Sequence, residues 1–329
     1  MTTFHLNQFK TVLVCGLFLI FHSCTVVPGS WKNEKINTGK RDDFHLLNSR
    51  ALKYLKANDP KGLKALLSKD MLANNNERQV ELISNRLNDN LYELLDEYYV
   101  VHKFKDTDTV RSVGGQVNRY NLLYPYAAME MYCAYFIPKK PDNKYMLSII
   151  YAKFNYGWKI IKLDVAPYTI NGKTAPELYA LARQQYDKNH VQAALNNVEL
   201  AVTCFKPGSY WQYPDELDAG KFYARVHTEV NQRYRYPLVL SQLASGPMIL
   251  RIYTKNGDDG TYPMVYYMTH YNLNDTTAVK KENVQIRNAV SKLMPGLDEN
   301  NKYIYYSAFN KMPTGYSSVD HFDMMQKVR

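Results

Sequence analysis

The spacing of apolar residues changes near residue 97, and this change constrains the fold more than any other feature of the chain. Before it, apolar residues recur every three or four positions. Leu47, Ala51 and Leu55 fall on one face of a first predicted helix. A third and longer helix is predicted over residues 76–96. After the change, β-branched and aromatic residues dominate, which is typical of strands.

Residues that favour turns and helix starts separate these segments. The sequence Asn58-Asp59-Pro60 predicts the start of a second helix, because Asp is a good N-cap and Pro fits the first helical position. The turn Asn155-Tyr156-Gly157 predicts a hairpin between the last two strands of this part. Alternation along the last strand is imperfect, which indicates a sheet covered on both faces. The predicted strands cover residues 98–105, 116–124, 128–137, 145–155 and 158–165.

Helices followed by a meandering antiparallel sheet resemble the nuclear-transport-factor-two-like superfamily, in which helices pack across a curved sheet to form a cone. The resemblance covers residues 42–168. Its most specific pieces are the Asn58-Asp59-Pro60 break and the closing hairpin at 156–161. It is a similarity of pattern without a catalytic signature, and it implies a cavity between sheet and helices.

A second helical region is predicted over residues 174–235. Thr174 is a candidate N-cap for the first helix of this region. A short turn at 187–190 makes this helix and the one that follows it antiparallel. One copy of a tetratricopeptide hairpin is similar in spacing, but such units need about three stacked copies to stand alone. We therefore expect a lone hairpin packed on a neighbour and extended by a helix at 215–229. The residues that carry this similarity are Tyr179, Tyr186, Ala194, Ala201 and Pro207.

The last part, residues 237–329, predicts a smaller α+β domain in the order β-β-α-β. Residues 256–260 form a loop between its first two strands, and the helix covers 278–294. Patterning is weak from Pro313 onward. The whole chain is thus predicted to be α+β, with a cone-like sheet, a helical hairpin and a C-terminal α+β domain.

Residues 1–23 have the pattern of an export signal. Eleven apolar residues follow Lys10, which is far short of the ~20 that a membrane-spanning helix needs. Ser23-Cys24 then resembles a bacterial lipobox, although Phe21 and His22 depart from it. Lipidation of Cys24 is expected, with conventional cleavage nearby or a retained anchor as alternatives. Residues 24–41 are predicted to form a flexible tether from a bacterial membrane, most consistent with the outer membrane.

Charge and cysteine content exclude some functions. The formal net charge is +10, but no block of five Lys or Arg occurs, and an exported protein does not meet nucleic acid. No CxxC motif supports thiol redox chemistry. Cys133 and Cys204 either pair in an oxidising compartment or serve as small buried apolar residues, and the sequence leaves both open.

Reactive constellations are scarce. Residues 256–260 lack the ligand spacing of an EF-hand, and Ser245-Gly246 lacks the glycine of a nucleophile elbow. Glu130, Asp142 and Asp164 are candidates to meet inside the cone as general acid–base groups. No metal site is predicted, because no two histidines have i, i+4 spacing on a helix. No cofactor or nucleotide site is predicted either. The histidines after the leader are His45, His102, His190, His227, His270 and His321.

Six tyrosines are candidates to line the cone cavity, where they would either cradle a ligand or fill the core. The sequence favours a membrane-tethered, non-catalytic binding or assembly module with a protein partner in the cell envelope. The alternative is a small-ligand binder or enzyme that uses the cone cavity. The oligomeric state is not indicated. The candidate cavity-lining residues are Tyr98, Tyr120, Tyr124, Tyr132, Tyr135 and Tyr151.

Overall fold

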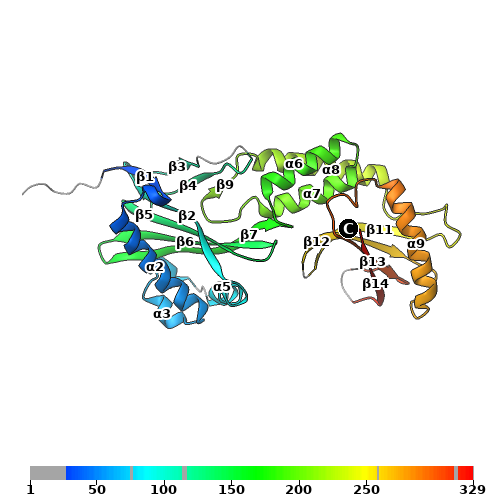
Figure 1. Cartoon of the computed structure of the whole chain (residues 1–329), viewed down its shortest axis with the longest axis horizontal. Coiled ribbons are helices and arrows are strands. Elements are labelled where there is room, and N and C mark those ends of the chain that lie inside the picture. Colours follow the sequence, from blue (N-terminus) through cyan, green and yellow to red (C-terminus); the bar gives the residue numbers. More distant parts are fainter. Residues whose placement is uncertain (1–26, 75–76, 113–116, 258, 315–317, 329) are drawn as a thin grey trace, which may run out of the picture.

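The computed structural model describes residues 27–74, 77–112, 117–257, 259–314 and 318–328. The fold is α+β, as predicted: helices cover a strongly curled antiparallel sheet, and a helical pair leads to a C-terminal mixed sheet (Figure 1). The export signal and Cys24 lie outside the described residues. Within the described residues, no helix is both long enough and apolar enough to span a bilayer.

The N-terminal sheet has six antiparallel strands in the order β1-β2-β5-β6-β7-β8 and curls into a half-barrel. Irregular register between Leu94 and Asp96, and again between Ile150 and Tyr151, interrupts the ladders. The predicted turn before Gly157 joins β6 to β7. The strands are β1 (Gly29–Lys32), β2 (Tyr92–Val101), β5 (Glu130–Pro138), β6 (Lys144–Phe154), β7 (Gly157–Ile170) and β8 (Lys173–Thr174).

Four helices cover one face of this sheet. Side-chain caps start three of them: Asn37 accepts from the Lys40 amide, Asp59 from the Gly62 amide and Ser68 from the Met71 amide. The predicted helix start at Asp59-Pro60 is therefore confirmed. The helices are α2 (Thr38–Lys56), α3 (Pro60–Lys64), α4 (Lys69–Ala73) and α5 (Glu77–Asp89), with a short 3₁₀ turn η1 (Asn33–Lys35) before α2.

The other face of the sheet is also covered, as the imperfect alternation predicted. A small sheet of β3 (Asp108–Arg111), β4 (Asn121–Tyr124) and β9 (Trp211–Gln212) lies over it together with the helical pair α6 (Ala175–Asp187) and α7 (Val191–Cys204). Helix α6 begins with a capping box between Thr174 and Glu177.

The C-terminal sheet has the order β10-β11-β12-β13-β14. Strands β12 and β13 are parallel, so the helix between them, α9, is a crossover connection. The elements are α8 (Glu216–Tyr234), β10 (Leu238–Val239), β11 (Met248–Gly257), β12 (Gly260–Met268), α9 (Thr276–Leu293), β13 (Tyr303–Phe309) and β14 (His321–Lys327).

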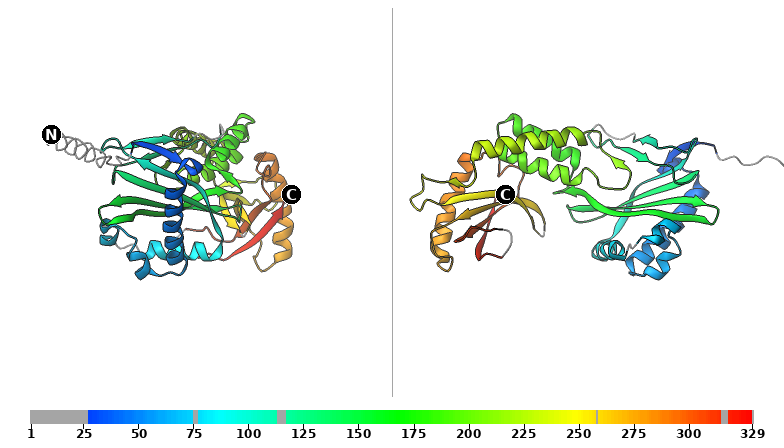
Figure 2. Two further views of the ribbon diagram at one scale, coloured as in Figure 1. Left: turned by 60° about the vertical axis from the view of Figure 1, so that its left-hand side comes forward. Right: turned by 180° about the vertical axis from the view of Figure 1, so that it is seen from behind.

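Helix α7 joins the two halves. Ala194 and Val198 pack in the core of the C-terminal half, whereas Ala201 and Cys204 pack in the core of the N-terminal half. Figure 2 shows the helices α6–α8 lying across both sheets. The β11–β12 turn adds a second contact, because Asn171 and Thr261 exchange two hydrogen bonds of 2.7 Å. Thr261, directly after this turn, is thus part of the contact between the two halves.

Two predictions about local structure are wrong, and one strand was not predicted. The flexible tether predicted over 24–41 is wrong from Gly29 onward, because β1 pairs with β2 and Trp31 stacks on Tyr99 at 5.4 Å. The helix predicted over 76–96 ends at Asp89, and β2 follows from Tyr92. The weakly patterned tail contains strand β14, which pairs with β13 over seven residues.

Candidate functional site

The six candidate tyrosines are all buried, with exposed fractions of 0–6%. They do not share one space. Tyr132 and Tyr151 face α2, whereas the other four lie on the opposite face of the sheet or in the strand that covers it. Successive residues of a strand point to opposite faces, so Tyr132 and Tyr135, three apart, must diverge. These side chains fill two cores. The four on the second face are Tyr98, Tyr120, Tyr124 and Tyr135.

The space between α2 and the sheet is occupied by stacked rings. The Phe44 ring lies on Tyr132 with centroids 4.1 Å apart, and Tyr132 is 5.6 Å from Tyr151. Trp158 meets Phe44 edge-on at 5.1 Å. This arrangement is the packed interior that the sequence favoured over an open cradle.

One buried polar network crosses this aromatic layer. Glu97 is 3% exposed and accepts a 2.7 Å hydrogen bond from the Tyr132 hydroxyl. His45 Nε2 lies 3.1 Å from both Glu97 oxygens, and Asn48 Nδ2 donates to the Tyr132 hydroxyl at 2.6 Å. Burial and the Glu97 charge raise the pKa of Tyr132, so its hydroxyl remains a donor. The network orders α2 on the sheet. The sequence did not predict it, because His45 and Glu97 are far apart in the chain.

The three carboxylates predicted as acid–base candidates are not brought together. Glu130 is the first residue of β5, and Asp142 follows the end of that strand. Asp164 lies in β7, where it pairs with Ser148 of β6. Burial alone would raise the pKa of Glu130. Its three donors outweigh burial and lower the pKa to about 2. These donors are Lys153 at 2.6 Å, Tyr99 at 2.5 Å and Lys40 at 3.0 Å.

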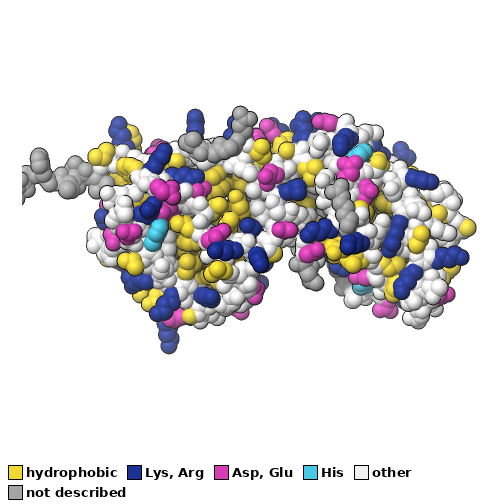
Figure 3. Space-filling view, viewed as in Figure 1, with side chains coloured by type: hydrophobic (Ala, Val, Ile, Leu, Met, Phe, Trp, Pro, Cys, Tyr) yellow, Lys and Arg dark blue, Asp and Glu magenta, His cyan; other side chains and the backbone are white. Residues whose placement is uncertain are grey.

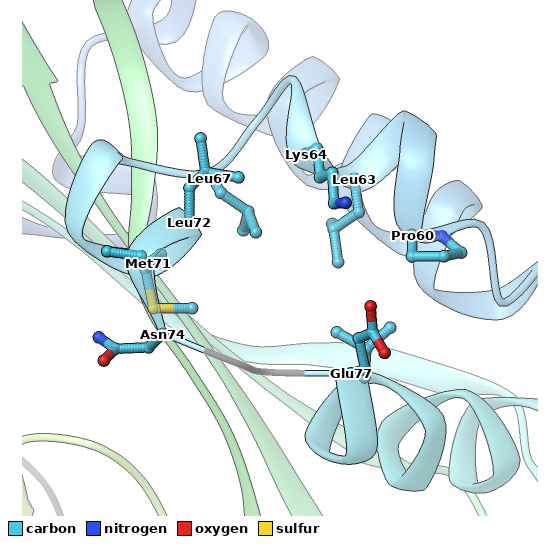
Figure 4. Close-up of a pocket in the computed structure, with 10 residues that line it drawn as sticks. Pro60, Leu63, Lys64, Leu67, Met71, Leu72, Asn74 and Glu77 are labelled. Atoms are coloured by element: carbon cyan, nitrogen blue, oxygen red, sulfur yellow. The ribbon is translucent and has the colours of Figure 1, made fainter.

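An open apolar pocket lies instead among the covering helices, between α3, α4 and α5 (Figure 4). Its volume is about 290 Å³, near the lower end of the range for ligand sites. Leu63 and Leu67 are buried in its wall, whereas Leu72 is 48% exposed. In Figure 4, Leu63 points toward Glu77 at the start of α5, and Met71 extends into the same space.

Charged side chains border this pocket. Lys64 and Glu77 belong to its lining, and an adjoining hollow of about 720 Å³ shares Pro60, Glu77 and Val80 with it. The second hollow adds Arg78 and Glu81. The apolar pocket thus opens into a polar groove. This arrangement suits a partner that inserts one apolar side chain and surrounds it with polar residues. The sequence contained no sign of this opening.

The two cysteines considered as a disulfide pair do not form one. Cys133 and Cys204 are free and buried, and burial raises the pKa of each thiol to about 12. Among the described residues, no three His, Cys, Asp or Glu side chains are grouped to hold a metal. On the face seen in Figure 3, Lys and Arg are spread over both halves with acidic side chains among them. No protein-family model matches the chain, and no curated protein matches it in sequence.

Proposed function

We propose that this chain is a membrane-tethered binding or assembly module that works on the periplasmic or cell-surface side of a bacterial outer membrane. A lipid on Cys24 would anchor it, and the pocket between α3, α4 and α5 would hold an apolar side chain of a protein partner in the envelope. The curled sheet and its helices support the further proposal that residues 42–168 belong to the nuclear-transport-factor-two-like superfamily.

The apolar pocket is the observation that carries this function. A leucine that is half exposed beside a walled hollow leaves apolar surface in water, and covering it stabilises a complex by roughly 25 cal/mol per Å². The polar groove beside it would exclude water around the anchor residue. A pocket of about 290 Å³ is sized for a side chain of a partner or a small ligand.

The predicted alternative, a ligand or enzyme site in the cone cavity, loses its support because rings occupy that space. Phe44, Tyr132 and Tyr151 are each at most 1% exposed. Glu97, the carboxylate nearest to them, is engaged by Tyr132 and His45. A reacting group needs a free carboxylate and room for a substrate, so these contacts favour the binding module over the alternative.

The short link to the anchor suits this function. Four residues lie between Cys24 and Gly29, where β1 begins, so the five Cα–Cα steps of this link span at most about 17 Å. Strand β1 is one edge of the sheet, whereas the pocket helices contact β7 toward the other edge. A lipid at Cys24 would therefore hold the fold close to the membrane while the pocket faces away from it.

Two experiments test the proposal. Metabolic labelling with a fatty-acid analogue is expected to mark the native protein and to leave Cys24→Ala unlabelled; absence of label on the native protein would refute the anchor. For the pocket, the cleaved soluble protein serves as bait in solubilised envelope. Leu72→Lys is expected to reduce partner recovery at least tenfold, a loss of about 1.4 kcal/mol.

Leu82→Lys is the matched control, because Leu82 is 53% exposed on α5 and does not line the pocket. Recovery of the same partner by both variants would refute the role of the pocket. Recovery of no partner by the unmodified bait would count against the assembly function itself.

A further inference from the structure

A second pocket lies between α7, α8 and β11, in the part that joins the two halves of the molecule. Its volume is about 430 Å³, within the range of small-molecule sites. The lining includes three buried apolar residues, Leu195, Val230 and Ile252, and otherwise consists of tyrosines and hydrogen-bonding groups. This composition differs from that of the apolar pocket between α3 and α5, so the two sites suit different ligands.

Tyrosines supply flat walls to this second pocket. Tyr223 comes from α8, Tyr253 from β11, and Tyr236 from the segment between them. Tyr253 is 41% exposed, so its ring is accessible to a ligand. The Tyr236 hydroxyl donates to Gln192 Oε1 at 2.9 Å, and Gln192 Nε2 donates in turn to Asn196 at 2.9 Å. These bonds hold the wall in place before any ligand arrives.

The polar groups of this pocket include a carboxyl group, Glu199, and a guanidinium group, Arg251. Glu199 has no hydrogen bond or ion pair through its carboxyl group among the described residues, and burial raises its pKa to about 7. At neutral pH this carboxyl can therefore both donate and accept hydrogen bonds. Arg251 donates to the Tyr253 hydroxyl at 3.0 Å and has no carboxylate partner in the described part of the chain. His227 and Asn231 add further hydrogen-bonding groups at the edge.

We propose that this pocket binds a neutral sugar ring, as a monosaccharide or as one unit of a glycan. A sugar ring offers an apolar C–H face that packs on tyrosine, and adjacent hydroxyls that pair with a carboxyl, an amide and a guanidinium. Glu199 accepts a hydrogen bond from a sugar hydroxyl but repels an anion, and Arg251 repels a cation, so the pair disfavours a strongly ionic ligand. The buried floor accommodates the remaining apolar edge of the ring.

Saturation-transfer NMR and calorimetry on the mature chain test this site, with glucose, galactose, mannose and N-acetylglucosamine as probes and glucuronic acid as the anionic comparison. At least one neutral sugar is expected to bind, and glucuronic acid more weakly. Tyr253→Ala is expected to lower the affinity at least tenfold. Tyr271→Ala, which removes a ring that is 42% exposed elsewhere on the C-terminal half, is expected to leave it unchanged.

Glu199 provides an independent check. Glu199→Ala is expected to lower the affinity, whereas Glu199→Gln, which keeps a donor and an acceptor, restores most of it. Binding of none of the four neutral sugars would overturn the proposal, as would stronger binding of glucuronic acid. Equal losses from Tyr253→Ala and Tyr271→Ala would also overturn it, because they would place the sugar elsewhere.

Discussion

Tyr132 and Tyr151 provide a matched test of how the N-terminal core is stabilised. They lie directly opposite each other on β5 and β6 and are 0% and 1% exposed. Replacing either one by Phe removes a single oxygen from the same layer. The two hydroxyls differ in one respect: that of Tyr132 joins Glu97 to Asn48, whereas that of Tyr151 has no hydrogen-bond partner among the described residues.

The expected free energies of unfolding therefore diverge. Tyr132→Phe leaves the Asn48 donor and one acceptor position of Glu97 without partners in a buried site. Each unsatisfied group costs about 1–3 kcal/mol, and Glu97 retains His45, so we expect a loss of about 2–4 kcal/mol. Tyr151→Phe removes a buried hydroxyl that makes no bond, so we expect no loss and a gain of up to about 1 kcal/mol.

Urea unfolding followed by tryptophan fluorescence measures this difference. All three tryptophans, Trp31, Trp158 and Trp211, lie in or against the N-terminal sheet, so the signal reports on this half. A shift of the midpoint at unchanged slope gives the change in stability. Equal effects of the two variants would refute the reasoning, because they would mean that the oxygen in the Glu97 network contributes nothing beyond the packing of the ring.

Three further predictions concern charge, backbone and thiols. The pKa of Glu130 is lowered from its ordinary value of 4.5 to about 2. The ion pairs of Glu130 therefore stabilise the fold fully above pH ~4.5, and this stabilisation is lost as the pH falls toward 2. Glu130→Gln is expected to flatten the pH dependence of the urea midpoint in that range. Gly296→Ala should lower the calorimetric Tm more than Gly157→Ala, because both have positive φ but a Cβ at 296 collides with His190 whereas one at 157 meets open space; equal shifts would contradict this. Both buried cysteines should resist a water-soluble thiol reagent until urea unfolds the chain, and rapid labelling of the native protein would contradict their burial.

Features with a local cause were predictable from the sequence. The helix start at Asp59-Pro60 and the turn before Gly157 depend on the preferences of a few adjacent residues, and both are confirmed. The end of α5 was not predicted correctly, because Leu91, Leu94 and Leu95 continue the helical spacing by coincidence. Pairing of Leu94 with Phe136 in β5 overrides that local pattern.

The candidate sites depended on relations that the sequence does not contain. Which tyrosines share a face is set by strand register, and irregularities in β2 and β6 shift that register along the strand. The bond between His45 and Glu97 joins a helix to a strand 52 residues away. The pocket beside Leu72 is lined by residues of three different helices, α3, α4 and α5, and no spacing of residues signals how such helices meet.

The position of α7 decides where a partner can bind. The sequence predicted a lone helical hairpin packed on a neighbour, and α7 packs in this way. Ten of the 14 residues of α7 are buried, and seven of these belong to the hydrophobic cores of the two halves. This helix therefore uses its apolar surface to fix the two sheets to each other, and little of it remains for another protein. The two binding sites that we propose, the pocket at α3–α5 and the tyrosine-lined pocket beside α8, therefore lie where this internal packing leaves surface open.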